Sequence, residues 1–212
     1  MADAARLTGL TMATAALAAV LACAGQPSGP GTAPADFGSA PSRQRTAAAP
    51  LPGGPETGAA PAPDARPERV QVREVGLDAP VRPVGVGERG AMTVPGDPLV
   101  AGWYRYGPAP GSRQGSAVLV GHVDSDTGAL GEFAALYEVR RGDRVEVRRT
   151  QAAPVVYRVV SRATVPKDEL SPTVFRRTGD PVLTLITCAP PFEPERGGYR
   201  ANLVVTAEPV RE

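Results

Sequence analysis

The chain of 212 residues is poor in the residue types that metal sites and disulfide scaffolds need. It has one histidine, His122, and two cysteines, Cys23 and Cys188. A zinc site made of cysteine and histidine takes three or four ligands, and a disulfide-stapled domain has several cysteine pairs. Both kinds of structure are excluded, and we predict no metal and no other cofactor.

Aromatic residues and an excess of one charge are also scarce. Aromatic residues make up 5% of the chain, so a core must be built from aliphatic side chains. The formal net charge is +1, which gives no electrostatic basis for binding nucleic acid. Lysine is nearly absent, because Lys167 is the only one of 23 basic residues that is not an arginine.

Residues 1–25 contain a long run without charge. No charged residue lies between Arg6 and Asp36, and the run begins with a stretch rich in alanine and leucine. Such a stretch is long enough to span a bilayer, and it also fits a secretory signal. Three interpretations stay open: a retained membrane anchor, which we favour, a lipoprotein signal with the lipid on Cys23, and a cleaved signal. Each predicts that the rest of the chain is exported.

Residues 26–68 are predicted to form a disordered linker. Residues 24–68 contain 10 prolines, 11 alanines and 7 glycines, and their only sizeable apolar side chains are Phe37 and Leu51. A segment of this composition buries too little apolar surface to offset the entropy lost on ordering. Its proline content favours an extended spacer.

Residues 69–212 are predicted to form one mostly β domain. Short runs rich in valine and leucine are separated by glycine and proline, which is typical of a barrel or a sandwich. The expected strands lie at 70–75, 116–120, 144–148, 155–160, 182–187 and 203–206. One short helix is expected at 131–139, with Phe133, Leu136 and Tyr137 facing inward.

Three side chains in this domain suggest nucleophilic chemistry. Cys188 is an unpaired thiol in an exported domain, where free thiols are a liability unless they react; the alternative is a buried cysteine that serves as a small apolar side chain. A thiol nucleophile needs a nearby imidazole, and His122 is the only one available. Arg200, at the start of the last expected strand, is a permanent cation that could stabilise an oxyanion.

The motifs around these residues resemble those of a known family. Residues 184–188, with the sequence TLITC, resemble the TLxTC signature of sortases, cysteine transpeptidases that attach proteins to the Gram-positive cell wall. Residues 121–125 are similar to the family's histidine motif, and residues 199–205 to the strand that carries its arginine. Residues 102–111 are similar to the class F (class E/F-like) sortases of actinobacteria.

The resemblance implies a fold and a reaction. The fold is a closed sortase-type β-barrel of about eight strands with short helices. The Cys188 thiolate attacks the Thr–Gly amide of an LPXTG-like sorting signal and forms a thioester. His122 protonates the leaving amine, and Arg200 hydrogen-bonds the oxyanion or the substrate backbone. An amine of lipid II, or a pilin lysine in polymerising relatives, then resolves the thioester.

The resemblance also implies a substrate groove and a location. Thr187 is expected to orient the substrate beside the nucleophile, and Pro166, Leu170 and Phe175 to lie in a loop over an apolar groove. We expect a monomeric catalytic domain, held at the cell membrane by the N-terminal segment and facing the wall. The alternative is a non-catalytic anchored barrel that binds wall polymer or a partner protein; it predicts that Cys188→Ala leaves function intact.

Overall fold

The computed structural model describes residues 32–38, 66–87 and 90–210. The expected membrane anchor at 1–25 and most of the expected linker at 26–68 lie outside these residues. Within the described ranges, no helix has the length and apolar character needed to cross a membrane.

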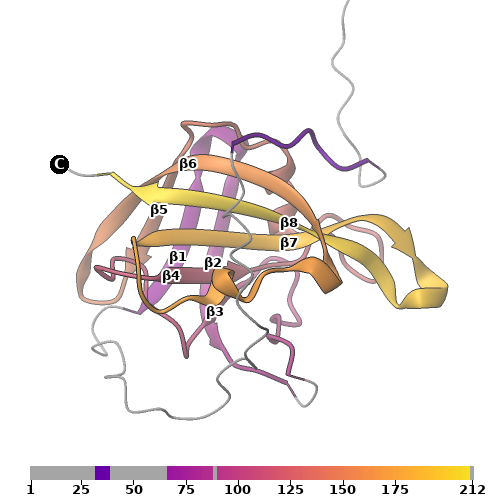
Figure 1. Ribbon diagram of the computed structural model, residues 1–212, viewed down its shortest axis with the longest axis horizontal. Helices are drawn as coiled ribbons and strands as arrows, with labels where there is room; N and C mark the ends of the chain where they lie inside the picture. Colours follow the sequence, from indigo (N-terminus) through magenta and orange to yellow (C-terminus); the bar gives the residue numbers. More distant parts are fainter. Residues whose placement is uncertain (1–31, 39–65, 88–89, 211–212) are drawn as a thin grey trace, which may run out of the picture.

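The domain is a closed barrel of eight strands in the order β1-β2-β3-β4-β7-β8-β6-β5 (Figure 1). The strands are β1 (Pro67–Val72), β2 (Leu77–Val84), β3 (Ala101–Tyr104), β4 (Ser116–Val120), β5 (Arg144–Arg149), β6 (Ala152–Pro166), β7 (Val182–Glu193) and β8 (Gly198–Pro209). The described helices are short and of the 3₁₀ type: η2 (Arg73–Val75), η3 (Glu132–Tyr137), η4 (Lys167–Glu169), η5 (Pro172–Phe175) and η6 (Pro194–Arg196). The predicted mostly β fold and closed barrel are confirmed.

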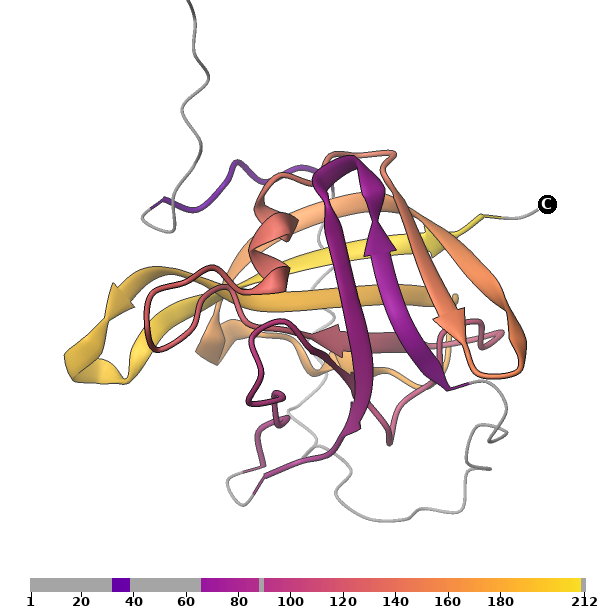
Figure 2. The ribbon, with the colours of Figure 1, turned by 180° about the vertical axis from the view of Figure 1, so that it is seen from behind.

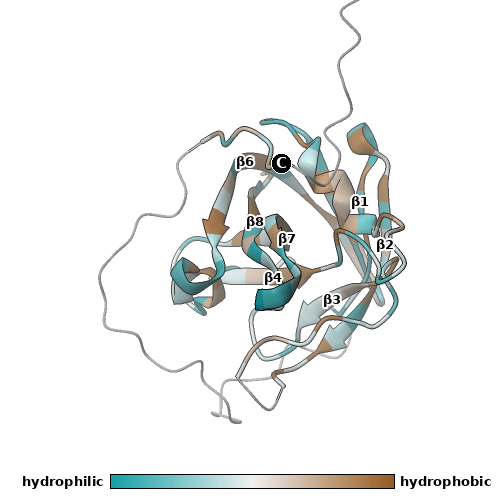
Figure 3. Ribbon diagram, turned by 90° about the vertical axis from the view of Figure 1, so that its right-hand side faces the viewer, coloured by the Kyte–Doolittle hydropathy of each residue, from teal (hydrophilic) through white to brown (hydrophobic). Residues whose placement is uncertain are grey.

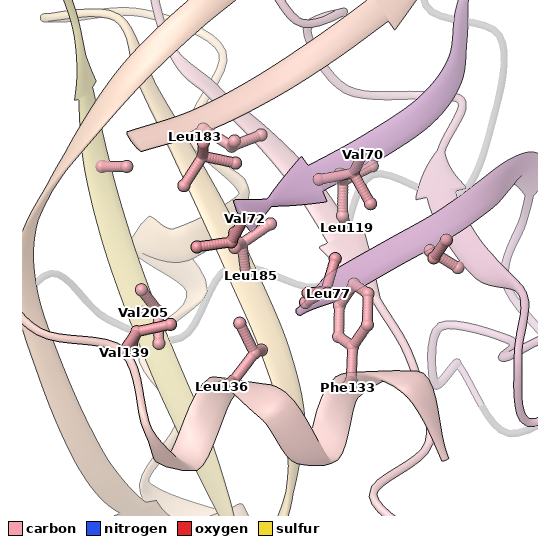
Figure 4. Packing of buried hydrophobic residues seen from close by; sticks show 14 of the residues in the cluster. Val70, Val72, Leu77, Leu119, Phe133, Leu136, Val139, Leu183, Leu185 and Val205 are labelled. Carbon is pink, nitrogen blue, oxygen red and sulfur yellow. The ribbon is translucent and has the colours of Figure 1, made fainter. Parts of the chain in front are cut away.

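The barrel interior is aliphatic, as the shortage of aromatic residues requires. Alternate residues of a strand point inward, so a strand with one side facing solvent, such as β5, alternates between buried and more exposed positions. Figure 3 shows hydrophobic and hydrophilic residues along the strands. Figure 4 shows part of the resulting core. Fully buried members of this core are Val70, Val72, Leu77, Leu119, Leu183, Leu185, Leu203 and Val205.

Helix η3 contributes three large side chains to the core. Phe133, Leu136 and Tyr137 are all buried, as predicted from their spacing. Figure 4 shows Phe133 and Leu136 rising from η3 toward Leu77 and Leu185. Seen from behind in Figure 2, η3 lies between the β1–β2 hairpin and the long β7–β8 hairpin.

Strand β7 is buried on both faces over its first half. Every residue from Val182 to Thr187 is buried, which explains why this segment has no charged residue and no alternation of polar and apolar residues. On the outer face, Ile186 belongs to a second apolar cluster with Val120 of β4 and Val174 of η5. This cluster holds η5 and the loop before it against the outside of the barrel, beside the part of β7 that leads to Cys188.

Candidate active site

The pairing of β4 with β7 brings His122 and Cys188 to the same level. The two strands are parallel, and their last registered pair is Val120 with Ile186. Two residues further along each strand stand His122 and Cys188. Because both strands run in the same direction, His122 stands just past the end of β4 at the level of Cys188, while β7 continues to Glu193.

Two hydrogen bonds continue this register beyond the last strand pair. The amide of Gly121 donates to the carbonyl of Ile186 over 3.1 Å. The hydroxyl of Thr187 donates to the carbonyl of Gly121 over 2.9 Å. The residue before the histidine is thus held on both sides by the residues before the cysteine.

The His122 side chain is held by a carbonyl of the loop between β2 and β3. Its Nε2 atom lies 2.7 Å from the carbonyl oxygen of Pro95. A carbonyl only accepts, so Nε2 carries a proton and donates it to this bond. The ring is therefore fixed in orientation, and Nδ1 is the nitrogen that remains to exchange a proton with a substrate.

Cys188 is a free, half-buried thiol at the outer face of β7. The hydroxyl of Tyr137 donates to the Cys188 carbonyl over 3.0 Å and fixes the backbone of this residue. Burial raises the pKa of the thiol above its usual value, and the charge of Lys167 and a side-chain hydrogen bond from it lower the pKa. The charge of Asp124 raises the pKa; its effect is smaller than that of the Lys167 charge and larger than that of the Lys167 hydrogen bond.

Strand register explains how Lys167 reaches the thiol. Ala189 on β7 pairs with Ala201 on β8, and Ala201 pairs with Pro166, the last residue of β6. Lys167 follows Pro166 directly, so its backbone lies two strands away from Cys188 at the same end of the sheet. Two strand spacings are about 10 Å, which the long lysine side chain can largely bridge. Sequence analysis gave Lys167 no role.

Arg200 stands on the same face of the β7–β8 hairpin as Cys188. Cys188 pairs with Asn202, and Arg200 lies two residues before Asn202 on β8, so the two side chains share a face. The guanidinium is directed along the hairpin: Nε lies 3.8 Å from a carboxylate oxygen of Glu193, and Nη1 donates to the Arg196 carbonyl over 3.4 Å. The Arg200 side chain is 44% exposed, so these contacts are weak.

Asp124, two residues after His122, is tied to β8. The hydroxyl of Tyr199 donates to a carboxylate oxygen of Asp124 over 2.5 Å. Burial raises the pKa of Tyr199, and this hydrogen bond raises it further, so the phenol keeps its proton. Tyr199 also packs edge-on against Phe192 with ring centroids 4.8 Å apart. The histidine loop is thereby joined to the β7–β8 hairpin.

The four residues predicted to bind substrate fall into three different environments. Pro166 and Leu170 line a pocket of about 250 Å³ between η4–η5 and the outer faces of β6 and β8. Phe175 packs edge-on against Tyr104 with centroids 5.4 Å apart, at the margin of the second apolar cluster. Thr187 is 2% exposed.

The structure gives Thr187 a supporting contact. Its buried hydroxyl donates to the Gly121 carbonyl, so it supports the backbone beside His122; its contact with the substrate stays a prediction. Nothing in the residue pattern distinguished the two roles, since a threonine next to a nucleophile suits either.

Tyr137 is a second residue that the sequence did not assign to the site. Its spacing predicted only that the ring faces inward, because the bond to Cys188 joins segments 51 residues apart. Among the described residues, His, Cys, Asp and Glu side chains form no group of three that could hold a metal ion.

With this geometry established, the comparisons with known proteins decide the family. The family model for the sortase domain matches residues 70–210. The chain belongs to the sortase family. A search of curated proteins finds no match to this sortase.

Solved sortase structures share its fold. Sortase C2 of pilus island 1 from group B Streptococcus is 24% identical, with a TM-score of 0.51 over 68% of this chain and 73% of that one. Sortase C-1 from Actinomyces oris is 23% identical, with a TM-score of 0.52 over 68% of this chain and 71% of that one. Sortase A from Listeria monocytogenes is 23% identical, with a TM-score of 0.51 over 70% of this chain and 89% of that one.

Proposed function

We propose that this sortase is a cysteine transpeptidase that cleaves an LPXTG-like sorting signal through a thioester on Cys188. The observation that carries the proposal is the parallel register of β4 and β7, which sets His122 level with a free, half-buried thiol. Nucleophilic catalysis by cysteine needs an imidazole near the thiol, and both are held here by backbone hydrogen bonds.

The first half-reaction uses the charges around the thiol. The Cys188 thiolate, which the Lys167 ammonium stabilises, attacks the threonine carbonyl carbon of the sorting signal. The Arg200 guanidinium donates to the oxyanion that forms, leaving its weak contacts with Glu193 and Arg196. When the C–N bond breaks, Nδ1 of the His122 imidazolium gives its proton to the departing glycine amine.

The second half-reaction reverses the proton transfer. An amine attacks the thioester carbonyl, neutral His122 takes the amine proton, and the Cys188 thiolate leaves as the new amide forms. The acceptor is a stem-peptide amine of lipid II or another wall amine, such as the pilin lysine that pilus-building relatives use. Water in place of the amine would give simple hydrolysis.

The pocket over β6 and β8 is the proposed binding place for the apolar part of the signal. Val165, Pro166 and Leu170 line it, and Val165 faces Asn202, the partner of Cys188 in the sheet. The Val165 end of the pocket therefore lies at the level of the nucleophile in the sheet. A leucine and a proline side chain are of suitable size for about 250 Å³.

Class and location belong to the same proposal. The similarity of residues 102–111 to class F sortases supports assignment to that class. The uncharged N-terminal run supports a domain held at the cell membrane with its site facing the wall.

The test is to incubate the full chain with an LPXTG-containing peptide and to measure the intact mass. We expect an adduct of the peptide up to its threonine on the wild type. Neutral hydroxylamine should release this adduct, because it cleaves thioesters. Cys188→Ala should give none, and Cys23→Ala should behave as the wild type.

Arg200→Ala and Arg200→Lys separate the roles of charge and geometry, since lysine keeps the charge without the planar fork of donors. Absence of an adduct, with a folded protein whose Cys188 still reacts with a small alkylating agent, would refute transpeptidation of this signal. It would favour the binding barrel that is the alternative function.

A further inference from the structure

The second half of β6 has an edge that its neighbouring strand leaves open. β5 pairs with β6 only from Ala152 to Arg158, while β6 continues to Pro166 with β8 on its other side. Backbone groups on such an open edge need partners. In Figure 1 the indigo segment, residues 32–38, lies at this edge.

Residues 35–37, here called the strap, supply partners to this edge. The amide of Phe37 donates to the Arg162 carbonyl and the amide of Arg162 donates to the Phe37 carbonyl, each over 2.9 Å. Two residues further along β6, the amide of Thr164 donates to a carboxylate oxygen of Asp36 over 2.8 Å. The strap thus docks by strand addition, although it lies within the segment predicted to be a linker.

The Arg162 side chain contacts both the strap and the interior of the domain. It is 8% exposed, and its guanidinium lies 5.1 Å from the centre of the Phe37 ring. Nη2 donates to the Ala35 carbonyl over 2.8 Å, and Nη1 donates to the carbonyls of Tyr137 and Val139. One buried fork of donors therefore joins the strap to the end of η3.

The residue after the strap suits this close approach. Gly38 has φ of +76°, a conformation that costs other residues energy. A Cβ atom there would lie 2.5 Å from the Val160 carbonyl oxygen. Each residue of Asp36-Phe37-Gly38 therefore has a reason to be there. The Asp36 carboxylate accepts from Thr164, the Phe37 ring packs on Arg162, and Gly38 leaves room for the backbone of β6.

The contacts continue from Arg162 to the nucleophile. Arg162 holds the carbonyl of Tyr137, and the hydroxyl of Tyr137 donates to the Cys188 carbonyl. We propose that the strap is part of the catalytic unit and that Arg162 is a positioning residue through which strap docking fixes Tyr137 and thereby the backbone of Cys188. The part of this inference that concerns turnover rests on the proposed function.

The strap also borders the proposed substrate pocket. Asp36 and Thr164, which bond each other, line the same pocket as Pro166 and Leu170. Loss of docking removes one wall of this pocket and loosens the nucleophile. Binding and turnover are then both affected, and Asp36→Ala weakens binding more than it slows turnover.

Phe37→Ala in the full chain tests docking and coupling separately. Docking is read from amide hydrogen exchange at Arg162 and Thr164, whose N–H groups bond to the strap. Coupling is read from the alkylation rate of Cys188, measured by mass on the peptide that contains it, and from the rate of thioester formation. Phe37→Tyr keeps the ring over Arg162, and Leu99→Ala, at a residue 53% exposed, is the control for loss of an apolar side chain elsewhere.

Phe37→Ala is expected to speed exchange of both amides by about tenfold, because it removes a partly buried cation–π contact. The rate of Cys188 alkylation is expected to change severalfold, and thioester formation to slow, with Phe37→Tyr restoring both. Exchange equal to that of Leu99→Ala would overturn docking. Faster exchange with unchanged Cys188 reactivity would overturn the coupling. If the wild type forms no thioester, the proposed function fails, and exchange and alkylation still decide the role of the strap.

Discussion

Replacement of Gly121 by alanine tests how the histidine is positioned. A Cβ atom at this position would lie 2.5 Å from Cγ and 2.6 Å from Cδ1 of Phe133. Phe133 is fully buried in η3 and its amide donates to the His122 carbonyl over 3.2 Å. The ring has no free space to move into, so η3 and the end of β4 must separate.

Overpacking of this kind costs about 1–3 kcal/mol. At about 3–4 °C per kcal/mol for a domain of this size, the melting temperature is expected to fall by roughly 3–12 °C. Thioester formation should fall as well, because His122 follows Gly121 directly. Melting is measured by calorimetry or circular dichroism, and acylation by intact mass.

The matched control is Gly96→Ala, the same chemical change beside Pro95, whose carbonyl binds His122. A Cβ atom at Gly96 meets nothing within 4 Å. In the double variant Gly121→Ala with Phe133→Leu, the smaller side chain relieves the clash. The loss of unfolding free energy in the double variant should therefore be about 0.5–3 kcal/mol smaller than the sum of the losses in the two single variants. Equal melting temperatures for Gly121→Ala and Gly96→Ala, or strictly additive costs, would refute the reasoning.

Three further variants test single contacts of the site. Tyr137→Phe removes the hydrogen bond to the Cys188 carbonyl and should cost about 0.5–1.5 kcal/mol at neutral pH in denaturant titrations. Burial raises the pKa of Tyr137 to about 12, so the wild type alone loses the stability contributed by this phenol as the pH rises from about 10 to 12. The difference in free energy of unfolding between the wild type and Tyr137→Phe should therefore narrow over this range. A constant difference would contradict the hydrogen bond from Tyr137 to Cys188. Lys167→Met removes the charge and hydrogen bond that lower the pKa of the Cys188 thiol, so the midpoint of its alkylation profile should move to higher pH; an unmoved midpoint would show that the ammonium is elsewhere. Thr184→Val leaves the buried Ser116 hydroxyl, 2.8 Å from that of Thr184, without its partner, and should cost about 1–3 kcal/mol. Adding Ser116→Ala should recover part of that loss.

The local pattern predicted what depends on neighbours in sequence. The valine and leucine runs gave strands because alternate or continuous burial leaves a direct trace in the sequence. The spacing of Phe133, Leu136 and Tyr137 predicted a short inward-facing helix, and the structure confirms it. The TLITC motif at 184–188 led to the sortase family, which the match over residues 70–210 confirms.

The same pattern did not predict contacts that depend on register and side-chain direction. The hydrogen bond from Thr187 to Gly121 was not predicted. Lys167 lies beside Cys188 because β6 ends at Pro166, which is level with Ala201 of β8 and Ala189 of β7. Arg200 shares the face of Cys188, and its guanidinium points along the hairpin toward Glu193.

The sequence by itself therefore determined most of the strands, though not β2 and β3. It also determined the aliphatic core, the family and the types of group available for the reaction, since each follows from residues close together in the chain. Only the tertiary structure decided which groups meet. The bond between Ala35 and Arg162 joins residues 127 positions apart, and the one between Tyr137 and Cys188 spans 51. Such contacts exist because barrel closure fixes every strand's register at once, and no single segment of the chain carries that information.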